Sequence, residues 1–146
     1  MLDKNPILLY NCINSLTQMG GTMEFKFDEH LPIYKQLVEQ IKVGILTGTY
    51  PCGEKLPSVR DLAILTKVNP NTIQRALLEL EEEGLITTKR TSGKFVTDNM
   101  KLIQKMKDSQ AETLTMKFLD DCQQLGISYQ MIFKMLKEKG EKYESN

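Results

Sequence analysis

Polar side chains gather at the start of one helical stretch in the middle of this 146-residue sequence. They are Asn69, Asn71, Thr72, Gln74 and Arg75. Amides, a hydroxyl and a guanidinium are the groups that hydrogen-bond to base edges and to phosphates. The same set is typical of the solvated face of a two-helix core element, and helical spacing alone does not separate these interpretations.

The helix that would carry these side chains has clear start and end signals. Asn69 can cap the free N–H groups of the first turn, and Pro70 takes the first helical position, where its missing N–H costs nothing. Gly84 is the expected end of the helix. Apolar residues recur at helical spacing on the side away from the polar set, at Ile73, Ala76, Leu77 and Leu80.

A shorter helix is predicted just before it. Ser58 is the candidate N-cap, and Asp61 lies three residues later, where its carboxylate can complete a capping box. Thr66-Lys67 ends this helix. A helix, a tight turn and a second helix in this order predict a helix-turn-helix, which places the first residues of its second helix in the major groove of DNA.

A β-hairpin is predicted directly after the second helix. Its first strand begins in the run 84–88, which is rich in β-branched residues, and its returning strand covers Phe95, Val96 and Thr97. Gly93 stands where a positive φ is expected. The tip carries the cations Lys89, Arg90 and Lys94, which suit phosphate or minor-groove contact, although cations on a hairpin are also typical of a solvated turn. Following the helix pair, the hairpin favours a winged helix.

These segments resemble the GntR family of bacterial transcription regulators over roughly residues 25–98, about half of the chain. The matching pieces are Pro32-Ile33-Tyr34, Gly48-Thr49-Tyr50, the run 53–63, the run 68–73, Leu80-Glu81, the run 83–86, and Gly93 with Phe95-Val96. The Val-Asn-Pro-Asn-Thr opening of the second helix and the short C-terminal region resemble the YtrA-like subfamily.

The resemblance implies roles for individual residues. Arg60 resembles the family's DNA-contacting arginine. We predict that Ser58 and Arg60 together contact a phosphate and a base edge from the first helix of the motif. The start of the recognition helix falls on Asn69, Asn71 and Thr72.

The sequence also departs from the family pattern. Many relatives carry arginine where this chain has Pro70 and Gln74, which implies a different operator. Thr91 replaces the first glycine of a Gly-x-Gly wing motif and Lys94 follows the second, which implies a stiffer and more cationic tip.

Overall charge is balanced, at 19 basic and 19 acidic residues, whereas many nucleic-acid binders are strongly basic. The distribution is uneven, because the stretch 55–78 holds four cations against Asp61 alone. The acidic run Glu79, Glu81, Glu82 and Glu83 then cancels that excess at the far end of the helix. We therefore predict salt-dependent binding that relies on specific contacts.

Several classes of function are disfavoured. Cys12, Cys52 and Cys122 are widely spaced and His30 is the only histidine, so we expect no metal site and no cofactor. No nucleophile accompanies that histidine and no phosphate-cradling glycine loop is found, so we expect no enzyme. No apolar run approaches the length of a membrane span, and reduced thiols fit a cytoplasmic protein.

Two segments precede the helix-turn-helix. Residues 1–22 differ from the rest and are predicted to be a disordered or mis-annotated extension, with Met23 as the true start. Glu24 to Asp28 alternates phenylalanine with charge and predicts a short strand or packing arm. Leu31 to Thr47 predicts an amphipathic helix that ends at Gly48.

Two further helices are expected after Asp98, one from Asn99 to Leu125 and one from Ser128 to about Lys139. A lone pair of helices is too small to bury its own apolar face. A second copy of the chain is the natural partner, and a symmetric dimer would match a palindromic operator. The candidate dimerisation residues are Leu114, Phe118, Leu125, Ile132, Phe133 and Leu136.

The sequence thus predicts a mainly α protein with a small β-hairpin. Residues 23–98 would form a winged helix-turn-helix domain and residues 99–146 a helical dimerisation region. The predicted function is a cytoplasmic homodimeric repressor that binds a palindromic double-stranded DNA operator. A winged helix that binds another protein without DNA is the alternative, and a small-molecule effector is left open.

Overall fold

A computed structural model describes residues 24–144, so the predicted extension 1–22 and the start at Met23 lie outside the described residues. The described part divides into two compact units between Asp108 and Ser109. The first holds α2 (Ile33–Leu46), α3 (Val59–Thr66), α4 (Pro70–Glu82), β1 (Ile86–Lys89), β2 (Gly93–Val96) and the start of α5 (Met100–Gln124). The second holds the rest of α5 and α6 (Tyr129–Glu144). The predicted fold class, mainly α with one hairpin, is confirmed.

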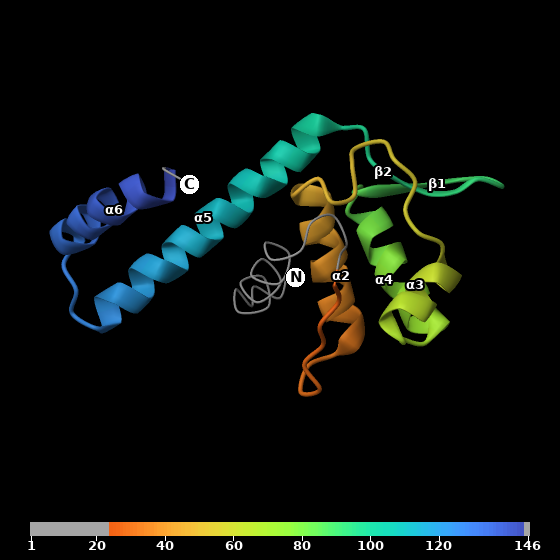
Figure 1. The fold of residues 1–146 in the computed structure, drawn as a ribbon, viewed down its shortest axis with the longest axis horizontal. Coiled ribbons are helices and arrows are strands. Elements are labelled where there is room, and N and C mark those ends of the chain that lie inside the picture. The colour runs from red at the N-terminus through yellow and green to blue at the C-terminus, as the bar shows by residue number, and fades with distance from the viewer. Residues whose placement is uncertain (1–23, 145–146) are drawn as a thin grey trace. The chain divides into compact units, whose positions relative to one another are not determined.

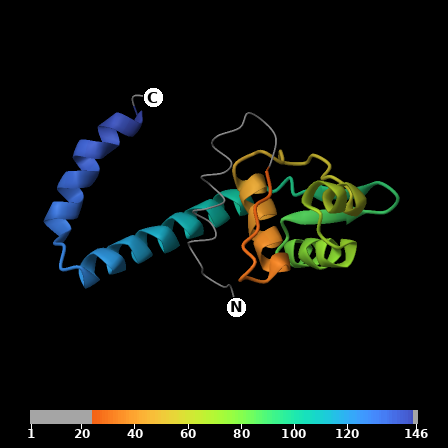
Figure 2. The same cartoon turned by 60° about the horizontal axis from the view of Figure 1, so that its bottom comes forward.

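The core of the first unit lies between α2, α3, α4 and the hairpin (Figure 2). Leu37 and Ile41 of α2 are buried against the four residues of the α4 stripe, Ile73, Ala76, Leu77 and Leu80. The sequence predicted that stripe, and all four side chains are at most 1% exposed. Because the four stripe residues lie on one face of α4 and that face is buried, the residues on the opposite face point toward solvent.

Helix α2 is buried almost all round, which the amphipathic pattern did not predict. One reason is the arm formed by residues 24–28, which runs beside α2 without joining a sheet. Phe25 and Phe27 stack with ring centroids 6.4 Å apart and pack against the core. The side-chain amide of Gln40 both accepts from and donates to the backbone of Lys26, at 3.0 and 2.7 Å. The polar groups of the buried glutamine are thereby satisfied.

A buried lysine joins α2 to the end of α4. The side chain of Lys42 is only 1% exposed, and its Nζ lies 2.8 Å from Glu83 Oε2 and 3.5 Å from Glu39 Oε1. Burial raises the pKa of Glu39, and the Lys42 charge opposes that shift. The acidic run at the end of α4 is therefore partly neutralised within the protein, because a buried cation needs a partner.

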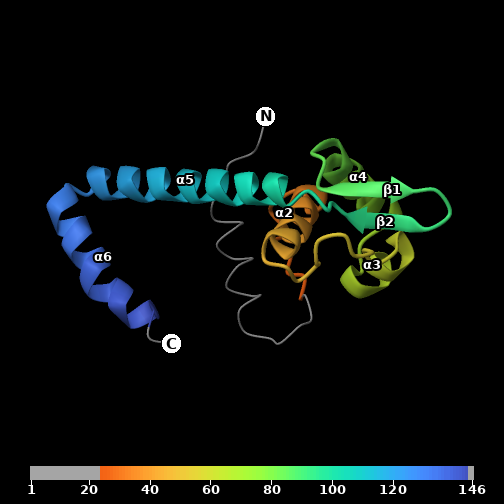
Figure 3. The ribbon, with the colours of Figure 1, turned by 90° about the horizontal axis from the view of Figure 1, so that it is seen from above.

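The hairpin pairs β1 with β2 in antiparallel register, with Ile86 opposite Val96 and Lys89 opposite Gly93 (Figure 3). The segment before α3 pairs with it too: the N–H of Leu56 donates to the Lys94 carbonyl and that of Val96 to the Glu54 carbonyl, each at 2.9 Å. The wing is thus held at its base from both sides of β2.

The second unit contains the end of α5 and all of α6. The turn between them uses Gly126 at φ 69°, and Ser128 Oγ accepts from the N–H of Met131, as the predicted stop and cap require. The predicted end of α6 near Lys139 was wrong, because the helix continues through Gly140 to Glu144. A single glycine costs a helix about 1 kcal/mol, which does not by itself end it.

Candidate nucleic-acid interface

Helix α3 begins with the predicted capping box. Ser58 Oγ accepts from the N–H of Asp61 at 3.1 Å, and Asp61 Oδ2 accepts from the N–H of Ser58 at 3.2 Å. The hydroxyl of Ser58 also donates to Asp61 Oδ2 at 2.6 Å. These hydrogen bonds from Ser58 lower the pKa of Asp61. The first turn of α3 is therefore fixed, and so is the backbone position from which Arg60 projects.

The turn between the two helices is tight. Lys67 ends α3 in the left-handed region at φ 57°, and Thr66 Oγ1 accepts from the N–H of Val68 at 3.3 Å. Asn69 Oδ1 then accepts from the N–H of Asn71 at 2.8 Å, and Pro70 occupies the first helical position of α4. The predicted cap is confirmed. Because its amide oxygen serves that cap, Asn69 keeps chiefly its amide N–H groups for an external partner.

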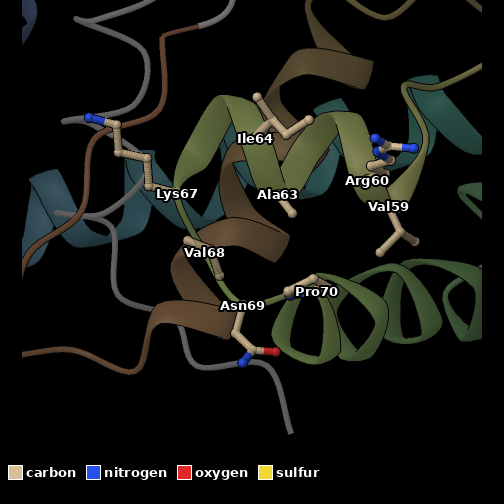
Figure 4. Close-up of a pocket in the computed structure, with 8 residues that line it drawn as sticks. All are labelled: Val59, Arg60, Ala63, Ile64, Lys67, Val68, Asn69 and Pro70. Atoms are coloured by element: carbon tan, nitrogen blue, oxygen red, sulfur yellow. The ribbon is translucent and has the colours of Figure 1, made fainter.

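An open groove lies between α3 and the start of α4 (Figure 4). Figure 4 shows Arg60 at the first turn of α3, Lys67 at the opposite end of that helix, and Asn69 at the start of α4. Arg60 is exposed, and no hydrogen bond or ion pair within residues 24–144 involves its guanidinium. Its donors therefore remain available for a ligand outside the chain.

The outer face of α4 carries the polar set predicted from the sequence. Asn71, Gln74 and Arg75 are exposed, Thr72 is half-buried, and the apolar Leu78 is 49% exposed on the same side. The guanidinium carbon of Arg75 lies 3.7 Å from the centroid of the Tyr34 ring on α2. The structure thus brings Asn71, Gln74 and Arg75 onto one solvent-facing surface, and it gives Arg75 a partner that the sequence did not indicate.

The wing turn holds two residues at positive φ, Thr91 at 64° and Gly93 at 108°. Gly93 fits the prediction, whereas Thr91 adopts a conformation that a β-branched residue seldom takes. Space at Gly93 is also restricted, because a Cβ there would lie 3.0 Å from Cε of Lys55. Lys55 thus lies against the wing turn. No sequence pattern indicates Lys55 as a site residue, because its proximity to the wing depends on the pairing of the segment before α3 with β2.

The three cations predicted at the wing tip have different surroundings. Arg90 is exposed, and Lys89 Nζ lies 4.3 Å from the centroid of the Phe95 ring. Lys94 points back toward α4, where its Nζ lies 3.0 Å from Glu81 Oε2 and 2.7 Å from Thr88 Oγ1. Glu81 Oε1 in turn accepts from the N–H of Thr88 at 2.9 Å. These hydrogen bonds from Thr88 and Lys94 lower the pKa of Glu81.

The described residues contain neither a metal-binding cluster nor a membrane-spanning helix. Within residues 24–144, no group of three or more His, Cys, Asp or Glu side chains could hold a metal ion. None of the described helices is long and apolar enough to cross a membrane.

Comparisons with known proteins agree with this geometry. Residues 33–96 match the family described as bacterial regulatory proteins, gntR family. The uncharacterized HTH-type transcriptional regulator YhcF of Bacillus subtilis is 35% identical over 115 residues, which cover 79% of this chain and 95% of YhcF. The HTH-type transcriptional repressor YtrA of the same organism is 35% identical over 108 residues, covering 73% of this chain and 83% of YtrA.

A solved structure is similar as well. A GntR family transcriptional regulator from Listeria monocytogenes superposes with a TM-score of 0.72 at 45% identity. The match covers 77% of this chain and 98% of that protein, so it extends beyond the helix-turn-helix.

A winged helix-turn-helix whose second helix presents a polar face to solvent is the architecture typical of DNA-binding transcriptional regulators. The relatives place it more narrowly: the chain belongs to the gntR family of bacterial regulatory proteins. The predicted resemblance to the GntR family and its YtrA-like subfamily is confirmed. The prediction that the chain is not an enzyme is confirmed by the same membership.

Proposed function

We propose that this protein is a cytoplasmic repressor that binds a palindromic operator as a homodimer. The observation that carries the proposal is the division of α4 into a fully buried stripe and a polar outer face at its N-terminal end. That face holds amide and guanidinium groups, which read base edges in the major groove. Residues 23–98 would form the DNA-binding domain, and residues 99–146 would hold two copies together.

In this proposal Arg60 and Ser58 contact DNA from the start of α3, and the first turns of α4 supply Asn69, Asn71, Thr72, Gln74 and Arg75. The wing contributes Lys89 and Arg90 at its turn, with Gly93 allowing the turn to form. Lys94 has a different part, because its ammonium is already paired with Glu81. We assign it to holding the wing against α4.

The homodimer is supported by apolar surface on the second unit. Phe118, Leu125, Phe133 and Leu136 are 45–77% exposed. Ile132 is only 6% exposed and is therefore not available for contact with a second copy. Leu114 is half-buried. An apolar surface of this kind on a small helical unit is typical of a protein–protein contact. A second copy covering it would also supply the two-fold axis that a palindrome requires.

Repression is proposed from the relation to YtrA of Bacillus subtilis, which is described as a repressor. We propose no particular effector, because no set of side chains in the described residues indicates the chemistry of one. The described part of the second unit has no cluster of metal-binding side chains.

The proposal is tested by selecting bound sequences from random duplex DNA with the full chain. We expect an inverted repeat, bound with one dimer per site, and weaker binding to scrambled DNA. An Asn71→Ala variant should lose preference at one position in each half-site, since a good bidentate base contact discriminates by about 1–3 kcal/mol. Lys105→Ala, which removes an exposed cation on α5, is the matched control. A dimer that enriches no sequence would favour the protein-binding alternative.

A further inference from the structure

Arg75, on the outer face of α4, stacks on the ring of Tyr34. The DNA-contacting roles proposed for the residues of that face do not explain this contact. It joins α4 to the start of α2, and it places the guanidinium carbon 3.7 Å from the ring centroid. Arg75 is exposed, Tyr34 is half-buried, and Tyr34 packs against the core. Within residues 24–144, the Arg75 side chain has no salt bridge or hydrogen bond. The stack is therefore the one interaction found for the Arg75 guanidinium among the described residues.

A stacked guanidinium keeps its hydrogen-bonding edges. Its five N–H donors lie in the plane of the group, whereas the ring covers only a face. Attraction between the cation and the ring is worth about 0.5–1 kcal/mol at an exposed site. The ring therefore holds the group in one place without using a donor, so less side-chain freedom is lost when an anion binds.

The position of the stack indicates which part of DNA it meets. Asn71 lies one turn before Arg75 on the outer face of α4, and it has no aromatic partner among the described residues. The stack instead holds the Arg75 guanidinium against Tyr34 of α2, the helix that packs beside α4. A guanidinium at the flank of a recognition helix lies where the sugar–phosphate backbone passes, because the helix itself fills the groove.

We propose that Tyr34 and Arg75 form a phosphate-binding pair beside the recognition helix, in which Arg75 contacts one backbone phosphate of duplex DNA and Tyr34 is its positioning residue. This inference rests on the proposed DNA binding and assigns Arg75 to the backbone, whereas the residue types alone fit base edges and phosphates equally. It also gives α2 a part in binding, which the helix-turn-helix pattern does not contain.

A phosphate contact and a base contact differ in two measurable ways. Losing a phosphate contact weakens binding to all duplexes by the same factor, and it lowers the salt dependence of binding by about one counterion. Losing a base contact changes the preference at one operator position. The experiment therefore titrates selected operator and scrambled DNA with the full chain at several salt concentrations.

Arg75→Ala should reduce the slope of log K against log salt by about 0.9 on both duplexes, and it should leave the selected sequence unchanged. Tyr34→Phe, which keeps the ring, should bind like wild type. Tyr34→Leu, which removes the ring, should weaken binding severalfold. In the Arg75→Ala background, Tyr34→Leu should have no further effect, because Tyr34 acts through Arg75. Thermal melts of each variant separate this loss from unfolding, and Lys105→Ala serves as the control for removing one cation elsewhere.

Three outcomes would overturn the inference. An altered base preference in Arg75→Ala with an unchanged salt slope would make Arg75 a base reader. Wild-type binding by Arg75→Ala would leave the stack a structural contact only. A further loss from Tyr34→Leu in the Arg75→Ala background would show that Tyr34 acts by another route. In each case the wild type still binds DNA and the proposed function stands, whereas a wild type that binds no duplex defeats both.

Discussion

Replacing the wing cations one at a time separates a residue that contacts phosphate from one that holds the wing in place. The side chain of Lys94 is only 16% exposed, and its Nζ is shared between Glu81 Oε2 at 3.0 Å and Thr88 Oγ1 at 2.7 Å. Arg90 is exposed at the turn, with no ion pair among residues 24–144. We therefore expect Arg90 to contact a phosphate and Lys94 not to.

The expected magnitude follows from counterion release. A single phosphate contact adds about 0.9 to the slope of log K against log salt, so a fourfold rise in salt weakens that contact about 3.5-fold. Arg90→Ala should therefore lower the slope of log K against log salt by about 0.9. The double variant Glu81→Gln/Lys94→Gln removes the wing pair without changing net charge, and it should keep the wild-type slope. Its cost should fall on stability instead, at about 0.2–1 kcal/mol for a partly exposed pair.

Fluorescence anisotropy with labelled operator at several salt concentrations measures both slopes, and urea unfolding measures the stability of each variant. The reasoning would be refuted by a double variant that loses as much slope as Arg90→Ala. That result would mean that Lys94 leaves Glu81 and binds phosphate when DNA arrives.

Four further outcomes are expected. Lys42→Met should lower the free energy of unfolding, measured by urea titration, by about 3 kcal/mol, because it leaves two half-buried carboxylates without their cation. Adding Glu83→Gln should restore most of that loss. Thr91→Gly should raise the free energy of unfolding by up to about 1 kcal/mol in the same assay, since it removes a β-branched residue from the left-handed region. Glycine introduced at a neighbouring position with negative φ should give no such gain. Burial raises the pKa of Tyr50 from 10.0 to about 12, so the stability that its neutral phenol contributes is complete below pH 10 and is lost as pH rises through 12; ultraviolet titration should show a late-ionising tyrosine that Tyr50→Phe removes. Phe133→Glu should give monomers by light scattering and abolish operator binding, and an intact dimer would place the interface elsewhere.

Much of the helix-turn-helix was predictable because its signals are local. The capping box joins Ser58 to Asp61 three residues away, and Asn69 caps its own helix, so sequence spacing alone identifies both. The α4 stripe was predictable for the same reason, since burial of one face follows the helical period.

The missed side-chain contacts join residues that are distant in the sequence. Lys42 meets Glu83 across 41 positions, and Lys94 meets Glu81 across 13. A charged residue in a helical stretch is expected at the surface, so no sequence pattern indicates that Lys42 is buried. The stack of Arg75 on Tyr34 likewise depends on how α2 packs against α4. These contacts decide which cations remain free for DNA, and for that reason the site could be predicted in outline while the state of individual side chains could not.

Glu81 has a wider consequence than its two hydrogen bonds. One of its carboxylate oxygens holds the first strand of the wing and the other holds Lys94 of the second, so the wing is fastened to α4, the proposed recognition helix. The distance between α4 and the wing is then fixed. We expect an added or deleted base pair between the stretch under α4 and the stretch under the wing to abolish binding, whereas base substitutions between those two stretches should be tolerated.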